Sequence, residues 1–265
     1  MKMNALKKSI LFALFIYLPI HTMAWGQLGH RIVGQIAESH LNAKAKTAVK
    51  NILGNESLAM CANWADFVKS DRAYDYLSTW HYINFPGGLA DAELNSILKA
   101  DTATDVYTKI IFLTKELKNK SLAQDKKVMY LRLLVHFIGD VNQPMHTGHL
   151  EDKGGNDIKL SWFGKSSNLH ALWDSDLIES QELSYTEYAK AINFCTPQQK
   201  TAWQKDPLTK WIEDSYHISQ KLYGNVTTGD KLSYRYIYDN LATANQQLLK
   251  GGVRLAGLLN EILGS

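Results

Sequence analysis

Histidine and aspartate stand four residues apart inside an apolar segment, and this pairing limits how the chain can fold. In "LRLLVHFIGDVNQPMH", His136 and Asp140 lie among leucine, valine, isoleucine and phenylalanine. Residues i and i+4 of a helix project from one face, so both side chains point the same way. Burying an ionised carboxylate is costly unless it is paired or coordinates a metal. The fold must therefore supply partners for these two side chains.

A second segment repeats the same spacing. In "NLHALWD", His170 and Asp174 are again four residues apart in apolar surroundings, and His146 follows the first pair after a Gln-Pro break. Imidazole with carboxylate is a common zinc ligand set. One such pair is weak evidence, because a solvated ion pair on a helix surface has the same spacing. Two pairs in apolar segments favour a metal site.

Two further ionisable residues lie upstream, each flanked by aromatic residues. Asp66 stands in "NWADF" and His81 in "WHYINF". Metal coordination would relieve the cost of burying them. A hydrogen bond between an aspartate and a histidine in the core would do so equally well, and these residues alone do not decide between the two.

Apolar residues recur at helical spacing through most of the chain, which predicts a mainly α protein. The helical segments are 28–41, 45–53, 58–68, 106–117, 128–141, 169–178 and several between 185 and 263, the last from about 234 to 263. Extended structure is expected only at 79–85 and at 158–163, which follows "GGN" like one arm of a hairpin. No linker divides residues 25–265, so we expect one domain with at most a short β-hairpin.

The first 24 residues have the pattern of a secretory signal peptide. Three lysines precede an apolar run over 10–20, and Thr22-Met23-Ala24 resembles a cleavage site. A membrane anchor is the alternative, but the run is shorter than the roughly 20 residues that span a bilayer. We expect a secreted or periplasmic protein that begins at Trp25 with a free amine and has no membrane span.

Charge and cysteine content narrow the function classes. The leader holds three of the 29 Lys and Arg residues and none of the 26 Asp and Glu residues, so positive and negative side chains balance in residues 25–265. A protein that binds nucleic acid mainly by neutralising phosphates usually has a basic excess, so a polyanionic partner needs another source of positive charge. Cys61 and Cys195 could form a disulfide or stay as thiols; neither lies in a CxxC pair, which argues against zinc held by sulfur.

The start of the mature chain adds an unusual ligand. Cleavage after Ala24 would free the α-amine of Trp25, whose reference pKa of roughly 7.7 to 8.0 makes it usable near neutral pH. The amine and the Trp25 carbonyl oxygen can form a five-membered chelate, and His30 follows closely in "WGQLGH". Signal cleavage would then complete a metal site.

Taken together, these motifs resemble the secreted S1/P1-type nucleases, which share a helical fold and a trinuclear zinc site with zinc-dependent phospholipase C. The resemblance runs through most of the chain, in "WGQLGH", "NWAD", "WHYIN", "LVHFIGDVNQPMH", "GGN" and "NLHALWD". It implies three zinc ions in a cleft. Their ligands would be Asp66, His81, His136 and Asp140 for the first, Trp25, His30 and the bridging Asp140 for the second, and His146, His170 and Asp174 for the third.

The resemblance also implies an activity. The expected enzyme is an endonuclease that cleaves single-stranded DNA and RNA to 5′-phosphorylated products through a metal-bridging hydroxide, and that also acts on 3′-mononucleotides; no stable protein partner is implied. The resemblance implies that Asp66 and Lys69 are catalytic, with Lys69 supporting the transition state. It also implies that Tyr82 stacks on a base and that Asn84 contacts the edge of the base. Relatives often have arginine and a carboxylate where this chain has Lys69 and Asn84. His149, His40 and His217 fall outside the motifs.

Two other functions remain open at this point. Zinc-dependent phospholipase C shares the metal scaffold, but that family usually ends its last ligand motif with Glu, whereas this chain has Asp174. An exported zinc-binding protein without turnover is the second alternative.

Overall fold

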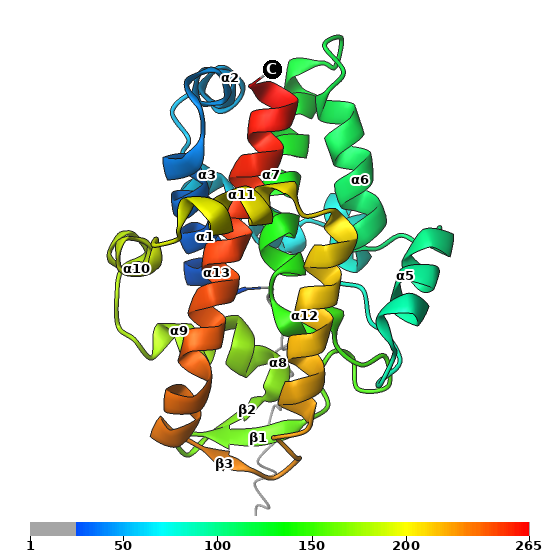
Figure 1. Ribbon diagram of the computed structural model, residues 1–265, viewed down its shortest axis with the longest axis vertical. Helices are drawn as coiled ribbons and strands as arrows, with labels where there is room; N and C mark the ends of the chain where they lie inside the picture. The colour runs from blue at the N-terminus through cyan, green and yellow to red at the C-terminus, as the bar shows by residue number, and fades with distance from the viewer. Residues whose placement is uncertain (1–24, 265) are drawn as a thin grey trace, which may run out of the picture.

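Helices make up most of the computed structural model, which describes residues 25–264 (Figure 1). The expected signal segment lies outside the described residues. The longer helices are α1 (Gln27–His40), α2 (Ala43–Leu53), α5 (Asp91–Ala100), α6 (Val106–Leu117), α7 (Gln124–Val141), α10 (Tyr185–Ile192), α11 (Pro197–Lys205), α12 (Leu208–Tyr223) and α13 (Tyr234–Leu263). The expected mainly α class is confirmed.

Short helical pieces connect these helices and carry much of the chemistry. They are α3 (Leu58–Cys61), α4 (Trp64–Phe67), the 3₁₀ helices η1 (Val68–Ser70), η2 (Arg72–His81) and η3 (Pro144–Thr147), then α8 (Leu169–Ala171), the π-helical η4 (Leu172–Asp176) and α9 (Leu177–Glu179). The segments expected as single helices over 58–68 and 169–178 are therefore each divided. Helix α5 was not expected.

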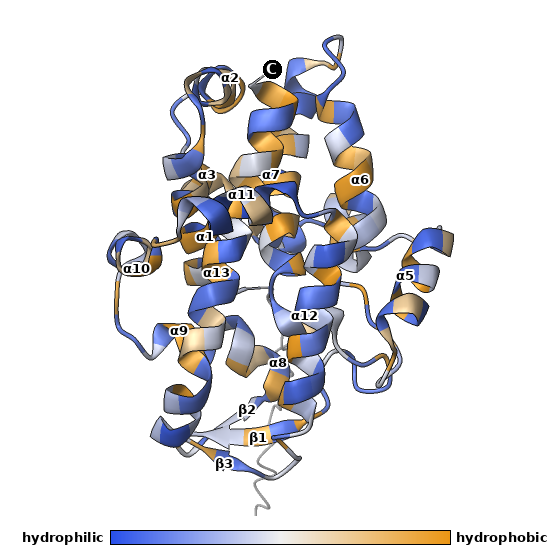
Figure 2. Cartoon of the chain, in the orientation of Figure 1, coloured by the Kyte–Doolittle hydropathy of each residue, from blue (hydrophilic) through white to orange (hydrophobic). Residues whose placement is uncertain are grey.

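Helix α7 runs through the middle of the molecule, between α13 and α6 in Figure 1. Its last eleven residues, 131–141, are buried apart from Arg132. An α-helix buried on all sides needs apolar residues on every face, which explains its run of Leu, Val, Phe and Ile. The exposed outer faces of α12 and α13 are more polar (Figure 2). Because this part of α7 is buried, its polar side chains His136 and Asp140 lie in the interior of the protein.

Helix α13 packs closely along α1, and a glycine allows this approach. A Cβ atom on Gly252 would lie 2.5 Å from Cγ2 of Ile36 and 3.0 Å from the Val33 carbonyl oxygen. Any side chain there would push the two helices apart. The contact holds α1, which carries His30, against the centre of the fold.

A three-stranded sheet with the order β2-β1-β3 lies at one end of the molecule. The sequence predicted at most a hairpin. Strands β1 (Lys159–Trp162) and β2 (Lys165–Asn168) form the expected antiparallel hairpin. The third strand, β3 (Lys231–Leu232), pairs parallel with β1. The hairpin expectation missed β3 because two residues far along the chain show no alternating pattern.

The segment 79–85 is extended only in its second half, so that expectation was partly wrong. Residues through His81 belong to η2, whose first turn is capped by Asp71. From Tyr82 the backbone is extended, and the N–H groups of Ile83 and Phe85 donate to the carbonyls of His146 and Gly148 at 2.9 Å. His81 is therefore the last residue of η2, directly before the extended segment that bonds to His146 and Gly148.

Both cysteines are free: Cys61 is buried and Cys195 is partly exposed. Of the two alternatives left by their spacing, the structure has the two thiols. Among residues 25–264, no helix is long and apolar enough to cross a membrane.

Candidate metal centre

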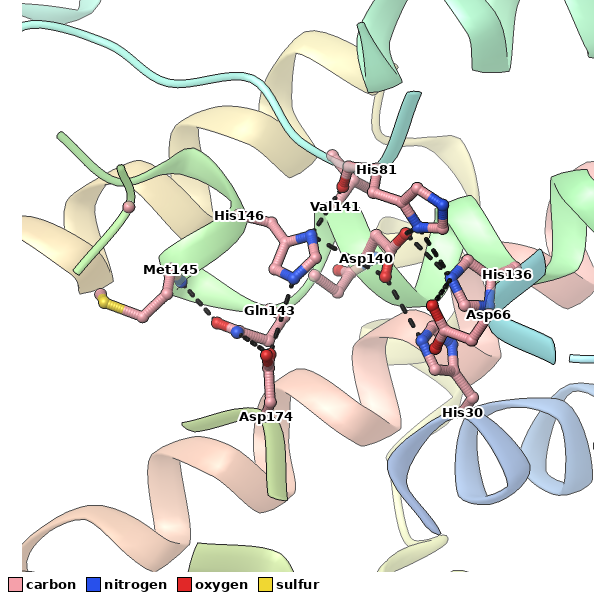
Figure 3. Close-up of polar contacts among 12 residues, drawn as sticks. His30, Asp66, His81, His136, Asp140, Val141, Gln143, Met145, His146 and Asp174 are labelled. Atoms are coloured by element: carbon pink, nitrogen blue, oxygen red, sulfur yellow. Dashed lines mark hydrogen bonds and ion pairs between the residues drawn. The ribbon is translucent and has the colours of Figure 1, made fainter. Parts of the chain in front are cut away.

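Eight of the predicted ligands lie in the interior of the protein, on seven helical elements. Figure 3 labels these residues apart from His170. All eight side chains are buried. They are His30 from α1, Asp66 from α4, His81 from η2, His136 and Asp140 from α7, His146 from η3, His170 from α8 and Asp174 from η4.

Asp140 stands at the centre of the larger cluster. Its Oδ1 lies 3.3 Å from Nε2 of His30, and its Oδ2 lies 3.0 Å from Nδ1 of His81 and 3.3 Å from Nε2 of His136. Asp66 joins this cluster through His136, whose Nε2 lies 3.8 Å from Oδ1 of Asp66. One carboxylate therefore faces three imidazoles with both of its oxygens.

A separate cluster contains His146, His170 and Asp174. Nε2 of His146 lies 3.5 Å from Oδ1 of Asp174, and Nε2 of His170 lies 3.1 Å from Oδ2. His146 also approaches the larger cluster, since its Nδ1 is 3.8 Å from Oδ1 of Asp140. The two clusters are therefore neighbours.

Three of the histidines are oriented by backbone carbonyls. Nδ1 of His136 donates to the carbonyl of Ala62 at 2.6 Å, and Nδ1 of His146 donates to that of His81 at 2.6 Å. Nδ1 of His170 donates to the carbonyl of Gly154 at 2.7 Å. A proton held on Nδ1 leaves the Nε2 lone pair free, which is how proteins usually prepare a histidine to bind metal.

Local backbone features put these groups in place. The π-helical turn of η4 includes Asp174, and such turns are frequent at functional sites. Gly154 has a φ of 65°, and a Cβ there would lie 2.5 Å from the Met145 carbonyl oxygen. Glycine is needed at this position because other residues rarely adopt such a φ. The "GGN" motif thus brings the Gly154 carbonyl to His170.

The electrostatic environment keeps the carboxylates ionised. Burial alone would raise the pKa of Asp66, but His136 and Lys69 outweigh burial and lower it to about 2. Burial also opposes ionisation of Asp140, yet His136 and His146 hold its pKa well below the usual range. For Asp174, burial is again outweighed, first by His170 and then by His146.

Burial and the neighbouring carboxylates shift the pKa values of two of the histidines in opposite directions. Burial lowers the pKa of His81 to about 4, against the opposing effect of Asp140. Burial would also lower the pKa of His146, but the carboxylates of Asp140 and Asp174 raise it to about 9. The cluster therefore strongly favours positive charge beside Asp140 and Asp174, which a cation can supply.

Several polar atoms of these side chains are buried without a hydrogen bond, which is the observation that tests the fit of a metal. They include Nε2 of His30 and His146, Oδ1 of Asp140 and Oδ2 of Asp174. Orphaned buried polar atoms are rare in proteins unless something else satisfies them. The donor set of imidazole nitrogen and carboxylate oxygen suits zinc, so these residues fit the expected ions.

Three groups among residues 25–264 have ligand atoms within 4.8 Å of one another and could each hold a metal ion. They are His30, Asp66 and His136; His81, His136 and Asp140; and His146, His170 and Asp174. The last matches the set predicted for the third ion. The set predicted for the first ion is divided between the other two groups, which share His136. The individual ligand assignments stay predictions.

Trp25 is fully buried at the start of α1. The next residue, Gly26, donates its backbone N–H to the Asp174 carbonyl at 2.6 Å. A Cβ on Gly29 would lie 3.2 Å from Cε3 of Trp25, so the indole packs back onto the helix. The backbone at Trp25 is thereby tied to the segment that carries Asp174.

A cleft of about 730 Å³ opens onto the clusters and also contains the predicted substrate-binding residues. Nζ of Lys69 lies 2.5 Å from Oδ1 of Asp66. Tyr82 is 41% exposed in the cleft wall, and Oδ1 of Asn84 is buried without a hydrogen bond. Tyr74 and Lys159 also line the cleft; both were missed, because a lone tyrosine or lysine carries no signal in sequence.

The histidines left unassigned lie in other surroundings. His149 stacks on Tyr223 with ring centroids 3.8 Å apart and shares a hydrogen bond with Gln220. His217 pairs with Asp91 on the surface. Neither belongs to any of the three possible metal groups.

Comparison with known proteins agrees with this geometry. The family model described as S1/P1 Nuclease matches residues 25–264. Endonuclease 2 of Arabidopsis thaliana is 31% identical over 94% of each chain. Nuclease P1 of Penicillium citrinum is 31% identical over 91% of this chain and 98% of its own, and Nuclease S1 of Aspergillus oryzae is 31% identical over 87% and 83%. The chain is therefore a nuclease that hydrolyses phosphodiester bonds, and it belongs to the S1/P1 nuclease family.

Proposed function

We propose that the protein is a secreted or periplasmic endonuclease with three zinc ions, processed to begin at Trp25. It cleaves single-stranded DNA and RNA to 5′-phosphorylated products and removes phosphate from 3′-mononucleotides. The observation that carries the proposal is the set of buried His and Asp atoms without hydrogen bonds at the base of an open cleft. Nuclease function rather than phospholipase C is supported by the family match.

Bound zinc would supply a water of lowered pKa and offset negative charge on phosphoryl oxygens. The buried carboxylates and imidazoles would hold the ions rigidly. The free Trp25 amine and carbonyl would complete the set beside His30 and Asp140. Cations concentrated in this way explain how a chain with balanced charge can bind a polyanion.

The chain's own side chains would position the substrate. Lys69, held by Asp66, brings an ammonium group to the cleft and would face a phosphoryl oxygen. Tyr82 presents an exposed ring on which an unpaired base can stack, and stacking of this kind favours single strands. Asn84 can both donate to and accept from a base edge, so it would not reject a base for lacking one of the two.

Metal analysis combined with substrate assays tests the proposal. We expect about three zinc ions in the protein that begins at Trp25, and cleavage of single-stranded DNA, RNA and 3′-mononucleotides in preference to duplex DNA. Asp140→Asn should lose more than one ion and more activity than His30→Ala, because Asp140 faces three imidazoles. Cleavage of phosphatidylcholine without cleavage of nucleic acid would replace the proposal with a phospholipase. Zinc binding without any turnover would replace it with a metal-binding protein.

A further inference from the structure

Gln143 lies between the two clusters and uses all of its main hydrogen-bonding groups there. It is fully buried in the turn between α7 and η3. Its backbone N–H donates to the Asp140 carbonyl at 2.9 Å, and its own carbonyl accepts from the His146 N–H at 3.0 Å. Its side-chain Oε1 accepts from the Met145 N–H at 2.5 Å, and its Nε2 donates to Oδ1 of Asp174 (Figure 3). One residue therefore contacts predicted ligands from both clusters.

The orientation of the Gln143 amide is fixed by its neighbours. The backbone N–H of Met145 is a donor and can face only the amide oxygen, so the NH₂ group must face the Asp174 carboxylate. Gln143 also caps η3, in which Pro144 occupies the first turn and restricts the backbone. The donor aimed at Asp174 is thus held in place by contacts within the protein.

This contact makes the two carboxylate oxygens of Asp174 unequal. Oδ1 accepts the N–H of Gln143. Oδ2 is buried without a hydrogen bond and lies 3.1 Å from Nε2 of His170. A hydrogen bond to one oxygen holds the plane of the carboxylate and directs the other oxygen toward the cation.

We propose that Gln143 is a positioning residue: its amide orients Asp174 so that this aspartate binds its metal ion through Oδ2, while its backbone sets the separation of Asp140 and His146. The inference rests on the proposed function for the metal set, and it gives a role to a motif residue that is not itself a predicted ligand. Loss of the amide should lower the affinity for the ion bound by Asp174. The two ions predicted around Asp140 should stay bound.

Two substitutions test the role of the amide. Gln143→Met keeps the length of the side chain and removes both polar groups. Gln143→Glu keeps the acceptor for the Met145 N–H and removes the donor to Asp174. The matched control is Gln247→Met, because Gln247 is an equally buried glutamine whose Nε2 donates to the Asn142 carbonyl and to Ser215, and not to a predicted ligand.

The measurement is zinc content after dialysis against increasing chelator, with the unfolding midpoint of the metal-free proteins alongside. Both Gln143 variants should lose one ion at chelator strengths that leave wild type and Gln247→Met intact, an affinity loss of about 10- to 100-fold for that ion. Retention of that ion by Gln143→Glu at the wild-type chelator midpoint would overturn the inference. Loss of all ions together, with a lower metal-free midpoint than Gln247→Met, would mean a general structural role and would also overturn it.

The outcome for the proposed function is read separately. A wild-type protein that cleaves single strands with three ions, and variants that keep all three equally well, would contradict the inference alone. A wild-type protein without nuclease activity, whose Gln143 variants still release one ion selectively, would contradict the proposed function and support the positioning role.

Discussion

Two buried carboxylates in this protein have pKa values shifted in opposite directions, because their neighbours differ. Asp140 is surrounded by imidazoles and has a lowered pKa. Asp105, the N-cap of α6, is also buried, but burial and the nearby carboxylate of Asp101 raise its pKa to about 7, against the opposing hydrogen bond from the Thr108 N–H. The same side chain is thus stabilised as an anion at one site and as a neutral acid at the other.

The raised pKa of Asp105 predicts a pH-dependent stability. The folded pKa exceeds the unfolded value of 3.8, so ionisation of Asp105 costs stability, progressively from about pH 4 to about pH 7. Asp105→Asn keeps an acceptor for Thr108 and removes this cost. We expect a higher melting temperature at pH 8, by about 2–4 °C for each kcal/mol gained, and little gain at pH 4. An equal gain at both values, or a gain in the exposed control Asp125→Asn, would contradict the assignment.

At the scale of elements, the contact between α1 and α13 depends on one of two adjacent glycines. Gly252→Ala would place a Cβ 2.5 Å from Cγ2 of Ile36, a distance that real Cβ atoms essentially never show, whereas the nearest atom to a Cβ in Gly251→Ala would be Val33 Cγ2 at 3.3 Å. Overpacking of this kind costs about 1–3 kcal/mol, while Gly→Ala in a helix gains up to about 1 kcal/mol. Urea unfolding should therefore show Gly252→Ala less stable than wild type, and Gly251→Ala close to it. Equal stability of the two variants would refute the close approach.

At the scale of the whole molecule, Trp25 is both the expected first residue of the processed protein and a buried part of its core. The indole is buried and the next peptide is bonded to the Asp174 carbonyl, so the new terminus would lie inside the protein. One extra residue before Trp25 should remove the amine ligand and lower metal affinity and activity by at least about 10- to 100-fold, the loss seen for groups that merely support a ligand. Zinc content and nuclease rate of the extended and unextended proteins provide the test. A one-residue extension at the C-terminal end is the control, and equal activity of both N-terminal forms would exclude an amine ligand.

Sequence patterns alone predicted the helical class and most of the long helices, because 3.6-residue periodicity is a local property. Val106–Leu117 and the long final helix were predicted to the residue or nearly so. Two candidate ligand pairs, His136 with Asp140 and His170 with Asp174, were predicted for a related reason: ionisable groups at i and i+4 in apolar segments leave few alternatives to pairing or metal binding. The full ligand set came from the family resemblance. Roles such as base stacking by Tyr82 came only from the family resemblance, and they stay predictions.

Tertiary structure decided what depends on distant contacts. Three features depend on packing between segments that are far apart in sequence, so no local pattern predicts them. They are the pairing of β3 with β1, the helical start of 79–85 and the two free cysteines. The same holds for Gln143, since the glutamine of "VNQPMH" becomes informative only once Asp174, 31 residues away, is placed beside it. The chain thus specifies locally which residues can bind a cation, and the fold specifies which of their atoms face it, because direction requires neighbours from several elements at once.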